Sequence, residues 1–269
     1  MEKTSLRSPK RGDLVVDEIK RWIAERRLAP GDKLPKEGEL QSLFGVSKGT
    51  AREALKSLEV QGLVTVSTGP AGGATIAAVP LERTFQLVQN YLFFHELDVA
   101  QIYAVRRLLE PELAAGAVPH LTERDFEALE RSIETCAPLP QSHDHAREQR
   151  TEDLHFHDVL AAANPNVLLR FMCELINRQL RHLVGMGDQP AHPAYQKLGD
   201  ANVAAHRKLL AAARKRDANA VRRLMAAHID EAGGIVATLD AAVRQRFVTD
   251  AELQGRIAPH KRGQGKETR

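Results

Sequence analysis

The N-terminal part of the chain combines short amphipathic segments with two runs rich in β-branched residues. Hydrophobic residues recur at helical spacing in three segments, at residues 13–27, 36–44 and 48–61. Val15, Ile19 and Ile23 share one stripe of the first segment, and Ser47 is suited to N-cap the third. The runs LVTVS and ATIAAV, separated by the flexible TGPAGG, predict a small β-hairpin.

Beyond Val79 and Pro80 the hydrophobic pattern is helical throughout. Helices are predicted near residues 81–96, 99–117, 122–136, 143–163, 166–184, 194–215 and 218–246. No β-rich segment interrupts them, so an antiparallel helical bundle is expected. The predicted fold class is therefore mainly α. A small α domain with a β-hairpin (1–78) precedes an all-α bundle (79–246), and a basic, disordered tail (247–269) follows.

Charge is distributed unevenly along the 269 residues. Residues 1–78 carry 13 basic and 10 acidic side chains, residues 256–269 carry 5 and 1, and residues 79–255 carry 20 and 24. The basic head and tail suggest a polyanionic partner such as nucleic acid, although a solvated charged face explains the charges equally well. Aromatic residues make up only 4%, which argues against a surface that stacks single-stranded bases in succession.

The sequence also bears on location. No apolar run approaches the length of a membrane span, and the N-terminal MEKTSLRSPKRGD lacks the apolar core of a secretory signal. The two cysteines, Cys136 and Cys173, form no CxxC motif and no disulfide framework. We therefore expect a cytoplasmic protein without membrane contact.

Three helices, a tight turn before the third and a two-stranded wing are typical of a winged helix-turn-helix that binds double-stranded DNA. The first turns of the third helix carry hydrogen-bond donors suited to DNA, at Ser47, Lys48, Thr50 and Arg52. Gly72, with the glycines at 69 and 73, allows the tip of the wing to approach the DNA backbone. The alternatives are a winged helix that binds protein, or a small helical domain with a polar surface.

The segment LPKEGELQSLFGVSKGTAREALKSLEVQGLV resembles the signature of the GntR family of bacterial transcription regulators, and the resemblance covers residues 13–78. It implies a DNA-binding regulator. Two departures bear on specificity. Gly38 stands where the family normally has a DNA-contacting arginine, and Lys48 replaces another such arginine, whereas Arg52 is retained. Because arginine and lysine differ at bidentate sites, the operator is expected to differ from the commonest family site, or to be bound more weakly.

Candidate metal ligands occur in the C-terminal half. Asp153 and His157 are four residues apart, so one helix face presents both. His206 and His228 lie at similar distances on either side of an expected turn at residues 216–217, so two antiparallel helices bring their imidazoles level. One carboxylate and three imidazoles suit Zn²⁺, Ni²⁺ or Mn²⁺. A chain with 11 histidines also shows such spacings by chance.

The same region, about residues 81–245, resembles the FCD domain, the all-helical ligand-binding half of the FadR subfamily of GntR regulators. The hallmark is D-x3-H in an FH..L…N context, followed by two histidines on the last two helices. The matching residues here are Asp153, His157, His206 and His228, with Asn164 in the expected place. The early R…E-P element is present as Arg106, Glu110 and Pro111. The resemblance implies a divalent transition metal, with zinc preferred.

A divalent ion with one carboxylate and three neutral imidazoles carries about one net positive charge, so a small carboxylate or sugar acid is the expected effector. Arg106 is a candidate second anchor for that anion, or else forms a salt bridge with Glu110. Arg178, which can equally make a helix–helix contact, and Asn164 are further effector candidates.

The leading hypothesis is a homodimeric regulator, a repressor rather than an activator, that reads a short inverted repeat and responds to the effector. A metal-dependent enzyme acting on a small acid is an alternative, but no catalytic motif is present. A DNA-binding regulator with a purely structural metal is the other.

Overall fold

The computed structural model of the protein describes residues 11–69, 72–92, 94–95, 97–185 and 193–237. The chain forms two compact units that divide between Val88 and Gln89. This division falls inside α4 (Leu81–Leu92), whereas the sequence pattern suggested a boundary at residue 78. Near the start of α4, Arg83 donates hydrogen bonds to the backbone carbonyls of Glu59 and Val60, which ties this turn to the first unit. The expected tail, 247–269, lies outside the described residues.

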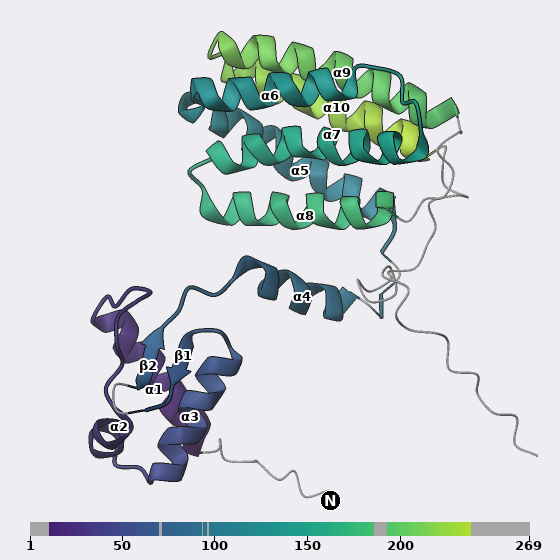
Figure 1. Cartoon of the computed structure of the whole chain (residues 1–269). Helices are drawn as coiled ribbons and strands as arrows, with labels where there is room; N and C mark the ends of the chain where they lie inside the picture. The colour runs from purple at the N-terminus through teal and green to yellow at the C-terminus, as the bar shows by residue number, and fades with distance from the viewer. Residues whose placement is uncertain (1–10, 70–71, 93, 96, 186–192, 238–269) are drawn as a thin grey trace, which may run out of the picture. The chain divides into compact units, whose positions relative to one another are not determined.

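The first unit is a three-helix domain with a hairpin (Figure 1). Its elements are α1 (Arg11–Glu25), α2 (Glu37–Phe44), α3 (Lys48–Val60), β1 (Val64–Ser67) and β2 (Gly73–Ile76). The two strands pair antiparallel, with Val64 opposite Ile76 and Ser67 opposite Gly73. Apolar residues from all five elements form one core, which includes Ile19, Leu40, Leu58, Val64 and Ile76. The expected helices and hairpin are confirmed.

The turn between α2 and α3 sets the position of the third helix. Gly45 ends α2 with φ 60°, in the left-handed region that glycine adopts readily. The hydroxyl of Ser47 then accepts a hydrogen bond from the backbone N–H of Thr50, at 3.2 Å, and so caps α3 as expected. Ala51 and Leu58 on α3 are completely buried, so the opposite face of the helix, with Lys48 and Arg52, is exposed.

The second unit consists of helices in its described part. They are α5 (Val99–Ala117), the 3-10 turn η1 (Val118–His120), α6 (Glu123–Cys136), α7 (His143–Ala163), α8 (Val167–Gly185), α9 (Pro193–Arg214) and α10 (Ala218–Ala237). α10 packs against α5 and α9, while α7 packs against α6 and α8 (Figure 1). The shared core includes Phe126, Phe156, Leu209 and Ile229. The mainly α fold, a winged helix-turn-helix followed by a helical bundle, is thus confirmed.

Within the described part of the chain, no helix is both long enough and apolar enough to cross a membrane.

Candidate functional site

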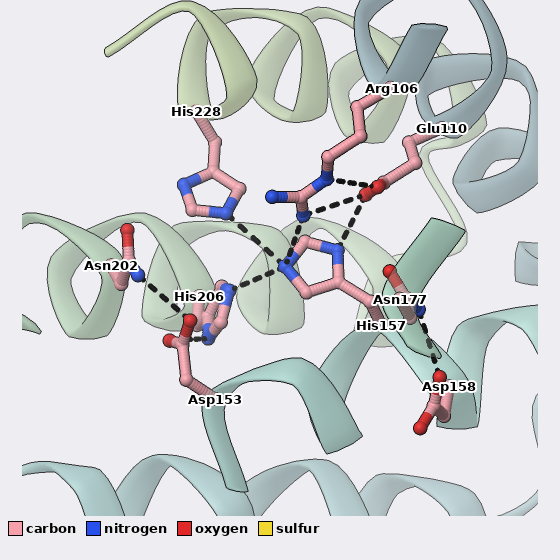
Figure 2. A network of polar contacts seen from close by, with 9 residues as sticks. All are labelled: Arg106, Glu110, Asp153, His157, Asp158, Asn177, Asn202, His206 and His228. Carbon is pink, nitrogen blue, oxygen red and sulfur yellow. Dashed lines mark hydrogen bonds and ion pairs between the residues drawn. The ribbon is translucent and has the colours of Figure 1, made fainter. Parts of the chain in front are cut away.

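Three imidazoles from three helices meet in the interior of the second unit. His157 lies on α7, His206 on α9 and His228 on α10, and Figure 2 shows their side chains pointing toward one another. The Nε2 atom of His157 lies 3.3 Å from Nε2 of His206 and 3.3 Å from Nε2 of His228. All three potential ligand atoms fall within 4.8 Å of one another, and each residue is buried. We call these residues the histidine cluster.

The turn between α9 and α10 brings His206 and His228 to the same level. Arg216 adopts φ 58° at this turn, and its guanidinium donates hydrogen bonds to the backbone carbonyls of Val118 and Leu121. Asp217 then caps α10, with its carboxylate accepting from the backbone N–H of Ala220 at 2.9 Å. His206 and His228 lie at similar distances from this turn along two packed helices. Both imidazoles are therefore beside His157.

Burial favours the neutral form of the His206 and His228 imidazoles, which is the form that binds a metal ion. Desolvation by burial lowers the pKa of both His206 and His228 well below the usual value, and the neighbouring imidazoles and Arg106 lower it further. Neutral imidazoles offer an Nε2 lone pair to a metal ion.

The spacing of the cluster also fits a metal. Tetrahedral zinc with Zn–N bonds of about 2.0–2.1 Å holds its nitrogen ligands about 3.3 Å apart. Two pairs of Nε2 atoms in the histidine cluster lie 3.3 Å apart. The donor set therefore fits a divalent transition metal.

A buried ion pair adjoins the histidine cluster. Arg106 and Glu110, one turn apart on α5, pair through Nε and Nη2 of the guanidinium and both carboxylate oxygens. Oε2 of Glu110 lies 2.7 Å from Nδ1 of His157, and Nη2 of Arg106 lies 3.4 Å from Nε2 of His157. Burial alone would raise the pKa of Glu110, but the charges of Arg106 and His157 outweigh it and lower the pKa.

These contacts give Glu110 a role that sequence reasoning missed. A carboxylate beside the Nδ1 atom of a histidine fixes the ring so that Nε2 faces a metal. The sequence offered Glu110 only as a salt-bridge partner for Arg106. The structure shows that pair, and it also places Arg106 beside the histidine cluster.

Asp153 lies at the edge of the histidine cluster. Its Oδ1 is 3.7 Å from Nδ1 of His206, the ring nitrogen that faces away from the cluster. Its Oδ2 accepts a hydrogen bond from Nδ2 of Asn202 at 2.8 Å, and burial raises the pKa of the Asp153 carboxyl. The structure therefore brings the three predicted histidines together and places the predicted carboxylate next to His206. Asn202, one turn before His206 on α9, was not foreseen.

The other effector candidates occupy different settings. Asn164 is buried at the end of α7, where its Nδ2 donates to the carbonyl of Leu113 at 2.7 Å and its Oδ1 accepts from the N–H of Asn166 at 2.8 Å. Its amide thereby joins α7 to α5. Arg178 lies on α8 and is partly buried.

The predicted DNA-contacting residues share one end of α3. Ser47, Lys48 and Arg52 are exposed there, and the hydroxyls of Ser47 and Thr50 are hydrogen bonded at 2.9 Å. Nη2 of Arg52 lies 3.3 and 3.2 Å from the two carboxylate oxygens of Glu37 on α2.

Gly72 lies in the hairpin turn, where a Cβ atom would approach the backbone oxygen of Ser67 to 2.4 Å. Any larger residue would disturb the turn, so this glycine has a conformational reason to be there in addition to its predicted place near DNA. Gly38 is different, because a Cβ atom built on it meets nothing within 4 Å. Packing would therefore allow a larger side chain at position 38.

Two family models match this chain. Residues 12–71 match "Bacterial regulatory proteins, gntR family", and residues 101–231 match the FCD domain.

Relatives and solved structures cover both units. The HTH-type transcriptional regulator LutR of Bacillus subtilis is 30% identical over 158 residues, which are 59% of this chain and 70% of that protein. The HTH-type transcriptional repressor NanR of Escherichia coli is 25% identical over 228 residues, 82% of each chain. The structure of a Streptococcus agalactiae GntR protein aligns with a TM-score of 0.57 at 23% identity, over 84% of this chain and 99% of that one, and supports the fold.

Proposed function

Because this chain belongs to the GntR family and carries an FCD domain, it is a DNA-binding transcription regulator, and we propose that it is a repressor controlled by a small carboxylate at a metal centre. The families and relatives that it matches are regulators and not enzymes. The observation that carries the proposal is the buried histidine cluster, in which burial lowers the pKa of His206 and His228. The NanR relative is a transcriptional repressor, which supports repression as the sign of regulation.

On the DNA side, the proposed contacts are Ser47, Lys48, Thr50 and Arg52, with Gly72 in the wing. The exposed start of α3 supports this assignment, since a helix N-terminus favours phosphate and its side chains can reach base edges in the major groove. We propose a homodimer that reads a short inverted repeat, because two-fold proteins match two-fold sites. A cytoplasmic location remains a prediction.

In the second unit, His157, His206 and His228 are the proposed metal ligands, with Asp153 as the fourth. Zinc is the preferred ion, with nickel and manganese as alternatives. When bound, such an ion offers a Lewis-acidic position to an oxygen donor. Glu110 orients His157 through Nδ1, and the ring of His206 stacks on Phe156 with the ring centroids 3.9 Å apart.

The charges around the histidine cluster favour an anionic effector. Arg106 and Glu110 neutralise each other, so a divalent ion and one Asp153 carboxylate leave about one net positive charge. Figure 2 shows the Nη1 end of Arg106, which Glu110 does not engage, directed toward His228. This donor supports Arg106 as the second anchor for a carboxylate. Arg178 remains a predicted effector contact, whereas both ends of the Asn164 amide are already hydrogen bonded to backbone.

The proposal is tested by thermal unfolding of the purified protein with a panel of small carboxylates and sugar acids, with and without a chelator. A ligand at ~100 times its dissociation constant adds ~2.7 kcal/mol of stability. We expect one acid to stabilise the metal-loaded protein and not the chelated protein. If chelation lowers stability and no acid raises it, the metal is structural and the effector proposal fails.

A further inference from the structure

Arg52, on the exposed face of α3, is in contact with an acid from a different helix. Glu37 is the first residue of α2, and each of its carboxylate oxygens lies within 3.3 Å of Nη2 of Arg52. The arginine side chain is 67% exposed, whereas that of the glutamate is only 27% exposed. The partly buried carboxylate of Glu37 therefore contacts one end of an exposed guanidinium.

This ion pair contributes little to folding, because exposed pairs of this kind are weak. Its effect is on the conformation of Arg52. An arginine side chain has considerable rotamer freedom, and its planar fork must be aligned before it can donate to O6 and N7 of a guanine. Glu37 engages only Nη2, and no described residue accepts a hydrogen bond from Nε or Nη1. The remaining donors of the fork are left for another acceptor.

Discrimination between base pairs by a guanidinium that donates two hydrogen bonds to one base depends on Arg52. Among the proposed contacts on α3, Ser47 and Thr50 have hydroxyls and Lys48 has a point charge, so Arg52 alone has a guanidinium. Position 38, directly after Glu37, has no side chain that reaches DNA.

We propose that Glu37 is a positioning residue that orients Arg52 for one base pair in each half-site of the operator, and so determines specificity. The inference rests on the assignment of α3 as the recognition helix. The effect expected when Glu37 is replaced differs from the effect of removing a charge alone. A carboxylate near DNA repels phosphates, so its loss as a charge alone would strengthen binding to every sequence equally. Loss of a positioning residue instead removes discrimination at one base pair.

The experiment starts from a site selected with the full-length protein from a random double-stranded DNA library. Binding of that site, and of versions with each base pair changed in turn, is measured by fluorescence anisotropy at one salt concentration. The variants are Glu37→Gln, Glu37→Asp, Arg52→Lys and the double variant Glu37→Gln/Arg52→Lys. Glu37→Asp keeps the charge but shortens the reach. Glu18→Gln, which breaks the exposed Glu18–Arg21 pair on α1, is the matched control.

We expect Arg52→Lys to reduce discrimination at one base pair by about 5- to 150-fold. Both Glu37 variants should reduce discrimination between bases at the same operator position. The double variant should discriminate there no less than Arg52→Lys alone. Glu18→Gln should leave every preference unchanged.

Two results overturn the inference and are distinguishable from failure of the recognition-helix assignment. In the first, Arg52→Lys removes discrimination at one base pair, but Glu37→Asp and Glu37→Gln each change the affinity for all DNA sequences by one common factor. Glu37 then acts only as a charge. An effect of Glu37→Gln that persists in the Arg52→Lys background also excludes positioning. If Arg52→Lys itself leaves every base preference intact, the assignment of Arg52 to DNA is wrong. Thermal unfolding of each variant verifies that it is folded, and Glu37→Asp provides a second readout if Glu37→Gln is not.

Discussion

Glu110 contacts both Arg106 and His157 in the interior of the second unit. It is buried, pairs with the buried Arg106 and lies beside Nδ1 of His157. We expect Glu110→Gln to lower the free energy of unfolding by about 3–5 kcal/mol, because it leaves an uncompensated buried guanidinium. The loss of the carboxylate beside Nδ1 should also weaken metal binding by about 10–100-fold.

A matched control lies two residues further along the same helix. Glu112 pairs with Arg222 on the exposed surface of α5 and α10, so Glu112→Gln should change neither stability nor metal affinity appreciably. Chemical denaturation and competition with a chromogenic chelator measure the two quantities. Equal effects of the two substitutions would show that the Arg106–Glu110 pair has no special role.

At the scale of elements, the turn between α9 and α10 determines whether His206 and His228 lie level. Arg216 has φ 58° and donates to the carbonyls of Val118 and Leu121. Arg216→Ala should lower the free energy of unfolding by about 2 kcal/mol, since it removes charged hydrogen bonds and retains a left-handed residue. Arg216→Gly should lose about 1 kcal/mol less, because glycine adopts this conformation without strain.

Arg27 provides the comparison for this effect. It has φ 53° at the end of α1, but its side chain is exposed. Arg27→Gly should therefore stabilise the protein slightly, or leave it unchanged. If Arg216→Ala and Arg27→Ala have equal effects on thermal unfolding, the contacts of the Arg216 guanidinium are not important.

The elements show what the sequence could predict and what depended on tertiary packing. The positions of helices and of the hairpin followed from periodicity and capping, and the turn expected at residues 216–217 is present, with Asp217 capping α10. The meeting of His206 and His228 followed from their equal distances from one turn. The contact of Glu110 with His157 was not predictable, because it depends on how α5 packs against α7. Asp153 shares its helix face with His157, but Asn202 from α9 binds its carboxylate, and spacing within α7 gives no sign of that contact.

At the scale of the whole molecule, two compact units with separate cores should differ in their response to acid. His206 and His228 have pKa values well below the usual value in the folded protein. Below about pH 6.5 the unfolded chain binds protons that the folded chain does not, so stability is present above this pH and is lost as the pH falls. Asp153, with its raised pKa, works in the opposite sense, but it is one group against two.

We therefore predict that acid destabilises the second unit selectively in the metal-free protein, by up to ~1.4 kcal/mol per pH unit for each of the two histidines. The single tryptophan, Trp22, lies in α1, so its fluorescence reports on the first unit, while far-UV circular dichroism reports chiefly on the bundle. Between pH 7 and 5.5 the circular dichroism transition should move to lower temperature and the Trp22 transition should not. His228→Gln should reduce the shift, whereas His155→Gln, an exposed histidine on α7, should leave it intact. A shift of both transitions together would mean that the histidine cluster is not the origin of the acid sensitivity.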